Sequence, residues 1–353
     1  MKMIENRAES LARLLAAMLV LGLVLAVGVV RWLGQRDVIE VHAAMPEDGG
    51  WQPDGLRVAV GQPLHLRLVS DDVQHGFAIG QSDQPALELK PGQPVETTLI
   101  FDQPGKYVFY CTHWCGLNHW RMRGTIEVAG PQDEKPIQPP PLYVALGLDI
   151  DAEHHARTVP DQQPSSARGA ALVARMPQEY NSKAYYQKHS PAQAWQALRQ
   201  EASLSDLDDQ QIWDLVAHLW GTQINSQDMT QGARLYAQNC AACHGESGQG
   251  DGVMAEKLAA VSGAPDRQSY IPEDGHGNQP LPSGIDGHSS VVPSDFTDAE
   301  HLLGASPAVL HGKIVRGGMG TGMPYWGPIF TDQQVWDLVT YLWTFQFDLE
   351  VYP

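Results

Sequence analysis

All four cysteines of this 353-residue chain lie in two short motifs, and this distribution constrains its fold more than any other feature. The first motif is CTHWCGLNHWRM, residues 111–122, which adds two histidines and a methionine to its two cysteines. The second motif is CAACH, residues 240–244. Because no cysteine is left over, each pair of thiols has to be explained by its own motif.

Length and charge set the broad class of the protein. A chain of this length is long enough for about two domains of ordinary size. Hydrophobic residues make up 43% of it and charged residues 18%, which indicates a globular protein. The formal net charge of -18 argues against nucleic acid as a partner, because phosphates repel an acidic surface. Such a surface suits a basic protein partner, and simple solubility is the alternative explanation.

The N-terminal segment, residues 1–36, is predicted to be a membrane anchor. Leu14–Val30 holds no charge, and a helix over it covers most of the roughly 30 Å hydrocarbon core of a bilayer. Lys2 and Arg7 precede this segment, which favours a cytoplasmic N-terminus with the remainder outside the cytoplasm. A cleaved signal peptide is the alternative, but no good small-x-small cleavage site stands before Arg31.

Residues 37–129 are predicted to form an antiparallel β-sandwich. Leu64, Leu66 and Leu68 alternate with polar residues, which is the period of a half-buried strand. Turn signals separate further short segments that are typical of strands. These segments are TTLIF (97–101), KYVFY (106–110) and GTIEV (124–128).

A proline-rich segment, residues 130–141, is predicted to be a semi-rigid linker. Beyond it the chain is predicted to be helical and duplicated. DDQQIWDLVAHLWGTQIN (208–225) aligns without gaps to TDQQVWDLVTYLWTFQFD (331–348), with 10 of 18 positions identical. Both copies place apolar residues on one face of an amphipathic helix. The two copies are assigned to residues 142–225 and 226–353.

The CAACH motif is the attachment signature of a c-type haem. The thiols of Cys240 and Cys243 add across the haem vinyl groups, and the imidazole of His244 becomes the proximal ligand of the iron. A zinc site is the alternative, but it needs two more cysteine or histidine ligands at short spacing. The second copy of the repeat is therefore predicted to carry one covalently bound haem c.

A low-spin electron-transfer haem needs a sixth ligand, and a methionine thioether in that position raises the reduction potential. The segment GGMGTGMPYWGPIF, residues 317–330, offers Met319 and Met323. Met323 is favoured because it stands just before a proline, which resembles the axial-methionine segment of small bacterial cytochromes c. The first copy has no cysteine, so it is predicted to be a haemless spacer.

The first cysteine motif is predicted to bind copper. Cys111, Cys115, His119 and Met122 lie between two predicted strands, and a ligand loop at this place is the copper-binding arrangement of cupredoxins. Thiolate and thioether sulfurs are soft ligands, and imidazole suits copper. A mononuclear blue copper site uses one cysteine, so the second thiol predicts two coppers bridged by both sulfurs. A Cys111–Cys115 disulfide is the alternative outside the cytoplasm.

This loop resembles the dinuclear Cu(A) motif of cytochrome c oxidase subunit II, which nitrous oxide reductase shares. The resemblance implies a cupredoxin-like Greek-key sandwich and a second histidine from an Asp-Val-x-His sequence, which DVQHGFAI (72–79) supplies as His75. It also implies a ligand from the backbone carbonyl of His113. One copper then takes His75 with Met122 or with that carbonyl, and the other takes His119.

The whole chain resembles subunit II fused to a C-terminal cytochrome c. Its single predicted anchor and the segments CGLNH (115–119) and RGTIEV (123–128) resemble the B-type oxidases. The expected fold class is therefore multidomain. It comprises one N-terminal transmembrane helix, a cupredoxin-like sandwich over 37–129, and an all-α cytochrome c region with a haemless first copy.

The resemblance implies the electron-input subunit of a membrane haem-copper oxidase. Electrons would pass from haem c to Cu(A) and on to the haem of subunit I, and no catalytic acid or base is expected. Implied partners are subunit I, membrane lipid, and a donor such as a soluble cytochrome c. The implied location is the bacterial cytoplasmic membrane, with the soluble domains on the periplasmic side. The alternatives are the same role in a Cu(A)-type nitric oxide reductase, or a membrane-tethered carrier without a fixed enzyme partner.

Overall fold

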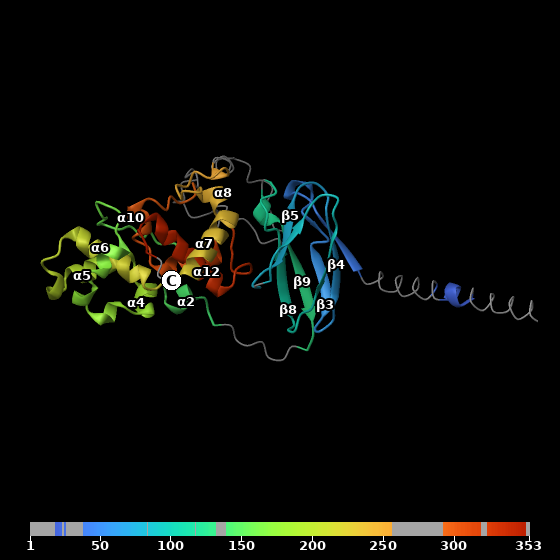
Figure 1. The fold of residues 1–353 in the computed structure, drawn as a ribbon, viewed down its shortest axis with the longest axis horizontal. Coiled ribbons are helices and arrows are strands. Elements are labelled where there is room, and N and C mark those ends of the chain that lie inside the picture. The colour runs from blue at the N-terminus through green and yellow to red at the C-terminus, as the bar shows by residue number, and fades with distance from the viewer. Residues whose placement is uncertain are drawn as a thin grey trace, which may run out of the picture.

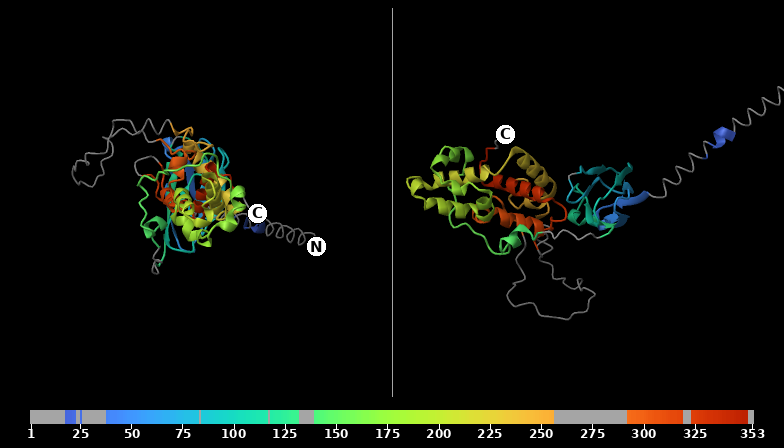
Figure 2. Two further views of the ribbon diagram at one scale, coloured as in Figure 1. Left: turned by 90° about the vertical axis from the view of Figure 1, so that its left-hand side faces the viewer. Right: turned by 90° about the horizontal axis from the view of Figure 1, so that it is seen from below.

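The structure is a computed structural model of the chain. It describes residues 18–22, 25, 38–82, 84–116, 118–131, 139–255, 292–318 and 323–350. A β-sandwich and a helical region lie end to end along the long axis of the molecule (Figures 1 and 2). The predicted order of a β region followed by a helical region is therefore correct, whereas the domain boundaries given above stay predictions.

The β-sandwich consists of two sheets. The four-stranded sheet has the order β2-β1-β4-β7, and the five-stranded sheet has the order β3-β9-β8-β5-β6. Two pairs of neighbours, β1 with β4 and β3 with β9, are parallel, and the other pairs are antiparallel. The strands are β1 (Val38–Ala43), β2 (Trp51–Gln52), β3 (Gly55–Ala59), β4 (Leu64–Ser70), β5 (His75–Ile79), β6 (Leu87–Leu89), β7 (Val95–Leu99), β8 (Gly105–Tyr110) and β9 (Arg123–Ala129).

The core between the sheets follows from the alternation in the sequence. Leu64, Leu66 and Leu68 of β4 point inward and are almost fully buried, as the period of two predicts. Aromatic rings fill the end of the core beneath the first cysteine motif, where the ring centroids of Trp51 and Phe109 lie 5.5 Å apart. This packing gives the loop between β8 and β9 a rigid base.

The helical region begins after the linker and holds most of the remaining described residues. Short 3₁₀ turns connect several of its helices. The described helices are α2 (Leu142–Ala145), α3 (Ser166–Ala170), α4 (Lys183–Lys188), α5 (Pro191–Arg199), α6 (Asp209–Gly221), α7 (Ser226–Asn239), α8 (Ala241–His244), α10 (Ala299–Leu302), α11 (Pro307–Arg316) and α12 (Asp332–Leu342).

The sequence repeat corresponds to a repeat of helix packing. α3 packs on α6, and α7 packs on α12 in the same way. A Cβ atom at Gly169 would lie 2.0 Å from the carbonyl oxygen of Asp214, and one at Gly232 would lie 2.1 Å from that of Asp337. Only glycine permits these two close crossings. In each copy, the two helices therefore cross at a glycine that packs against the aspartate at the equivalent position of the repeat.

The caps of the helices are repeated as well. Ser190 caps α5 and Ser306 caps α11, each at the start of a Ser-Pro-Ala sequence. Both α6 and α12 begin with a capping box, in which the side chain of the N-cap residue and a glutamine three positions later satisfy each other's backbone amides. The predicted helices over the two aligned segments are confirmed.

The predicted membrane-spanning helix is not found. Leu14–Val30 lies mostly outside the described residues, and only residues 18–22 and 25 within it are described, all as helix. None of the helices that the structure describes is long and apolar enough to cross a bilayer. A span needs about 20 consecutive apolar residues in one helix, and the described helical residues here are far fewer. The transmembrane part of the predicted fold class is therefore wrong.

Candidate metal centre

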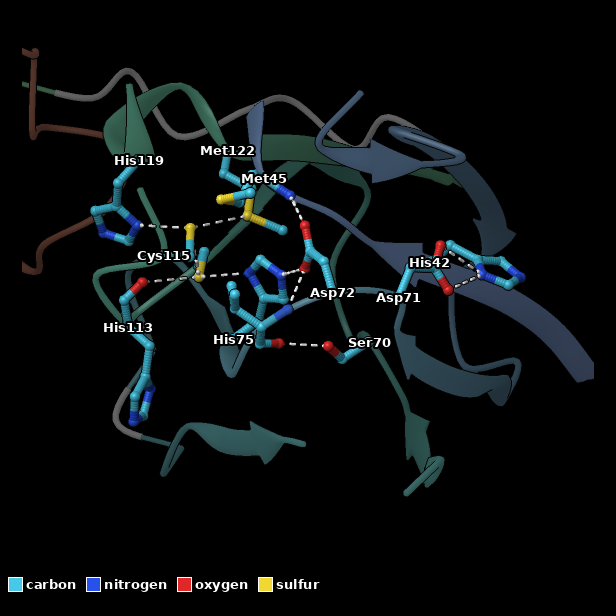
Figure 3. Close-up of polar contacts among 12 residues, drawn as sticks. His42, Met45, Ser70, Asp71, Asp72, His75, His113, Cys115, His119 and Met122 are labelled. Atoms are coloured by element: carbon cyan, nitrogen blue, oxygen red, sulfur yellow. Dashed lines mark hydrogen bonds and ion pairs between the residues drawn. The ribbon is translucent and has the colours of Figure 1, made fainter. Parts of the chain in front are cut away.

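The first cysteine motif forms a buried cluster of sulfur and nitrogen ligands at one end of the sandwich (Figure 3). The loop from β8 to β9 contributes Cys111, Cys115, His119 and Met122, and the first residue of β5 contributes His75. All five side chains are at most 6% exposed. The fold thus brings together the residues that the sequence predicts from two segments 36 positions apart.

Distances within the cluster place the two sulfurs at its centre. The Sγ atoms of Cys111 and Cys115 lie 4.0 Å apart, and both cysteines are free thiols rather than a disulfide. Nδ1 of His75 lies 3.8 Å from Sγ of Cys111, and Nδ1 of His119 lies 3.4 Å from Sγ of Cys115. Each thiol therefore has its own imidazole, on opposite sides of the sulfur pair.

Two weaker ligand candidates complete the cluster. Sδ of Met122 lies 3.7 Å from Sγ of Cys115, and the carbonyl oxygen of His113 lies 3.2 Å from Sγ of Cys111. The imidazole of His113 points away from the sulfurs in Figure 3 and lies 3.2 Å from the side-chain amide of Gln74. Of His113, the backbone carbonyl thus faces the cluster, and it is the group that the resemblance to oxidase subunit II implies as a ligand.

Asp72 orients His75, a role that the sequence analysis did not assign. Nε2 of His75 donates to Oδ1 of Asp72 at 2.7 Å, which leaves Nδ1 directed at the sulfurs. The amides of Met45 and Val73 donate to the same carboxylate. Burial opposes ionisation of Asp72, but these hydrogen bonds outweigh it and lower the pKa of the carboxyl. A carboxylate behind a ligating histidine fixes the tautomer of the ring. The signal in the sequence was the Asp at the start of DVQH.

Met122 is held from two sides. Its carbonyl oxygen accepts hydrogen bonds from the indole Nε1 of Trp51 and from the amide of Cys111, each at 3.1 Å. Trp51 lies on the neighbouring sheet, 71 positions earlier in the chain, so no local pattern could have indicated this contact. The two bonds set the position of the thioether before any metal binds.

One of the two thiols, Cys111, favours the form that binds metal. The hydrogen bond between the two thiols lowers the pKa of Cys111 far below its ordinary value, against the effect of burial, and it raises the pKa of Cys115. Thiolate is the form that ligates a metal. His75, Cys111 and Cys115 form the one group of side chains in the described residues whose ligand atoms all lie within 4.8 Å of one another. Soft sulfur with imidazole is a donor set that fits copper.

The second cysteine motif lies on a short helix. α7 ends at Asn239, Cys240 caps the next helix, and α8 carries Cys243 and His244. Burial raises the pKa of the Cys240 thiol to about 12 and also raises that of Cys243. Both shifts favour the protonated thiols, which stand three residues apart just after the end of α7.

His244 is fixed by residues that the sequence analysis missed. Its Nδ1 lies 3.0 Å from the carbonyl oxygen of Ser294, and its ring stacks on Phe296 with centroids 4.6 Å apart. This leaves Nε2 as the ring nitrogen that can ligate a metal. Burial lowers the pKa of His244, so the imidazole stays neutral, which is the form that binds iron. Both residues lie about 50 positions later in the chain, so the motif itself gives no sign of them.

Met323 lies in the segment between α11 and α12. It is partly buried and packs against the core of the helical region. Its carbonyl oxygen accepts a hydrogen bond from the amide of Gly318 at 3.2 Å. The alternative ligand, Met319, lies outside the described residues. The choice between the two methionines stays a prediction.

Known proteins resemble each half of the chain separately. The model of the family described as Cytochrome c matches residues 229–346. Cytochrome c oxidase subunit 2 of Thermus thermophilus is 35% identical over 79 residues, which is 22% of this chain and 58% of that protein. The corresponding protein of a second strain of the same species is also 35% identical, over 46% of its length. The chain thus spans about half the length of the curated relatives it matches.

Two further proteins are similar to part of the chain. Nitrous-oxide reductase of Ralstonia nicotianae is 38% identical over 58 residues, which is 16% of this chain and 9% of that protein. A solved structure of a heme-copper terminal oxidase dimer matches with 25% identity and a TM-score of 0.23. That match covers 26% of this chain and 65% of the other chain.

Proposed function

We propose that this chain, which fuses a region homologous to cytochrome c oxidase subunit 2 to a cytochrome c region, is the electron-input subunit of a haem-copper terminal oxidase. The observation that carries the proposal is the pair of buried thiols with one imidazole beside each, in the same chain as a CxxCH motif. Thiolate pairs of this kind suit electron transfer, because bridged metals change little in geometry when they gain an electron.

We propose a dinuclear copper centre in the sandwich. Cys111 and Cys115 would bridge the coppers, His75 and His119 would bind one copper each, and Met122 and the carbonyl of His113 would supply the weaker ligands. When bound, the copper pair supplies a one-electron acceptor. The protein keeps the ligands buried and in fixed positions, so that little reorganises during transfer.

We propose one covalently bound haem c in the helical region. Cys240 and Cys243 would form the thioether bonds, and His244 and Met323 would be the axial ligands. Ser294 and Phe296 would hold the ring of His244 in place, because their contacts already fix its orientation. A methionine as sixth ligand would keep the potential of the haem high enough to accept electrons from a soluble donor.

The proposed path needs a donor and a membrane partner. The formal net charge of -18 favours a basic donor such as a soluble cytochrome c. The acceptor would be the haem of oxidase subunit I in the bacterial cytoplasmic membrane. Covalent haem attachment and a soluble donor both favour the periplasmic side for the two redox regions. In this proposal the chain carries electrons and its partner reduces oxygen.

Co-purification tests the proposal. The full chain, isolated from membranes in mild detergent, should bring with it a polytopic haem protein and contain two coppers per haem c. The complex should consume oxygen with reduced cytochrome c as donor. Consumption of nitric oxide but not oxygen would assign the same chain to a nitric oxide reductase. One copper or none per haem in fully loaded material would contradict the dinuclear centre.

A further inference from the structure

The sandwich contacts the helical region at the segment that follows Met323. This segment comprises residues 325–329. Two of its carbonyl oxygens, those of Gly327 and Ile329, accept hydrogen bonds from Gln81, which lies two residues after the end of β5. The amide of Gln81 donates to the carbonyl oxygen of Ile329 at 2.7 Å, and its side chain donates to that of Gly327 at 2.6 Å. The neighbouring Gly80 is equally close, because a Cβ atom there would lie 2.2 Å from the carbonyl oxygen of Pro328.

Arg123, the first residue of β9, reaches from the sandwich into the same segment. Its Nη1 donates to the carbonyl oxygen of Tyr325 at 3.0 Å. Its guanidinium carbon lies 5.3 Å from the ring centroids of both Tyr325 and Trp326. The other terminal nitrogen, Nη2, is buried without a hydrogen-bond partner in the described structure, so the aromatic faces are what stabilises that end of the cation. Trp326 is itself buried in the helical core and stacks on Phe330.

This contact links a residue of the thiol cluster to the proposed methionine ligand of the haem by a short path. Arg123 directly follows Met122, whose side chain lies in the thiol cluster. Tyr325 is two residues after Met323, the proposed axial ligand of the haem. One hydrogen bond therefore connects Met122 and Met323 through a few residues of main chain. Electrons cross covalent and hydrogen-bonded links more readily than an open gap of the same length.

Another part of the boundary between the two regions is open. A cleft of about 990 Å³ lies between the edge of the sandwich and α7 and α12. Ala78, His113 and Glu88 line it on one side, and Arg234 and Asp337 line it on the other. Val108 and Tyr110 of β8 also pack against the helical core, so the described contacts are those of β8 and those of segment 325–329. A boundary that holds such a cleft depends strongly on the contacts that remain.

We propose that Arg123 is a positioning residue for electron transfer within the chain. It docks segment 325–329 against the start of β9, and so it sets the separation of the haem and copper sites. This inference rests on the proposed function. With both cofactors bound, one electron would pass from ferrous haem, leaving it ferric, to the oxidised copper pair, and this transfer would need no bond to form or break.

Substitution of Arg123 tests the proposal on the full chain with both cofactors loaded. After rapid reduction of the haem, the rate at which the electron reaches the copper pair is measured from the two absorption spectra. R123Q should slow this rate by about tenfold or more, while the haem potential and the copper spectrum stay unchanged. R123K keeps the charge, but a lysine cannot both donate to the carbonyl oxygen of Tyr325 and cover the rings of Tyr325 and Trp326. Its transfer rate should therefore lie between those of the wild type and R123Q. R57Q is the matched control, because Arg57 is an exposed arginine on the same sheet.

A second variant disturbs the docking of segment 325–329 at another residue of the sandwich, Gly80. G80A places a methyl group against the carbonyl oxygen of Pro328 and should push the two regions apart. The matched control is G55A, because a Cβ atom at Gly55 meets nothing within 4 Å. For both Arg123 and Gly80 variants, small-angle X-ray scattering of the metal-free chain should show a larger radius of gyration. This readout needs no cofactor.

The outcomes separate the inference from the proposed function. If R123Q and G80A leave the radius of gyration unchanged, Arg123 does not dock the two regions and the inference is overturned. If the radius grows but the transfer rate matches that of R57Q, the role in electron transfer is overturned. If the wild-type chain binds no copper pair while both variants still expand, the proposed function fails and the docking role stands.

Discussion

At the scale of single residues, the thiol cluster is organised by groups that bind no metal. Asp72 directs Nδ1 of His75 toward the sulfurs, and Trp51 holds the backbone of Met122. The protein's own hydrogen bonds thus hold two of the proposed ligands in position, so metal binding would have to order little. Such preparation predicts that removal of one ligand harms the copper centre without disturbing the haem region, which has its own core.

Cys115→Ser is expected to abolish the dinuclear copper spectrum. A serine hydroxyl is a poor copper ligand, so the bridge is lost and copper content should fall from about two to one or none per chain. Electron paramagnetic resonance and metal analysis of the purified chain measure this, and the haem should remain reducible by dithionite. His113→Ala is the control, because its side chain points away and its carbonyl remains. A dinuclear spectrum in the serine variant would refute the bridging role.

Met323→Leu is expected to lower the potential of the haem. Leucine fills a similar volume but cannot ligate iron, so the sixth site opens or takes a weaker ligand. The potential should fall by on the order of 0.1 V, within the roughly 0.8 V range that axial ligands set. Spectroelectrochemical titration measures it, and Met176→Leu in the haemless copy serves as control. An unchanged potential would indicate Met319 as the ligand.

At the scale of elements, the two copies of the repeat differ in the hydrogen-bond partners of one aspartate, which is Asp214 in the first copy and Asp337 in the second. Arg168 of α3 forms a double hydrogen bond with Asp214 of α6, with both distances 2.7 Å. In the second copy, the residue before the crossing glycine is Gln231, and among the described residues the side chain of Asp337 receives a hydrogen bond only from Gln333. Burial therefore raises the pKa of Asp337 to about 6.

The raised pKa of Asp337 makes stability depend on pH with a known sign. Between pH of about 4 and 6 the folded chain holds a proton that the unfolded chain has lost, so the free energy of unfolding falls as pH rises. Asp337→Asn should remove this fall in the free energy of unfolding, because asparagine does not ionise. The helical region should then be more stable at pH 8 by on the order of 1–2 kcal/mol. Thermal unfolding followed by circular dichroism at pH 5 and pH 8 measures it.

Gln231→Arg is also expected to stabilise the helical region at pH 8. The new guanidinium would pair with Asp337 as Arg168 pairs with Asp214 in the first copy. Asp214→Asn is the control of opposite sign, since it removes the partner of an existing ion pair. Equal pH dependence in the wild type and in both Asp337 and Gln231 variants would show that Asp337 does not ionise in this range.

Much of each element could be predicted from local pattern, whereas contacts between distant segments could not. The alternation of Leu64, Leu66 and Leu68 and the repeat of the terminal helices predicted strands and helices correctly. In the thiol cluster, Cys111, Cys115, His119 and Met122 came from the first motif and His75 from the resemblance to oxidase subunit II, and their role as metal ligands stays a prediction. The hydrogen bond from Arg123 to Tyr325 joins residues 202 positions apart. The periodicity of a sequence predicts local structure and cannot predict such a contact. The carbonyl of Ser294 gave no signal, because every residue carries one.

At the scale of the whole molecule, the two regions have separate cores. One cluster of buried apolar residues lies wholly within the sandwich and the other within the helical region, and Val108 and Tyr110 of β8 are partly buried side chains that pack against the second. Regions with separate cores and a small contact are expected to unfold in separate transitions. Copper binding should therefore stabilise one transition and not the other.

Calorimetry of the haem-loaded chain, with and without copper, measures this. A ligand that binds only the folded sandwich stabilises it by RT ln(1 + [L]/Kd), which is about 4 kcal/mol at a thousandfold excess over Kd. The copper-dependent transition should thus move to higher temperature, while the transition that coincides with loss of the haem spectrum stays in place. The Cys115→Ser chain should show no shift. If both transitions moved together, the docking contact at Arg123 would couple the two regions into one cooperative unit, and R123Q should then separate them.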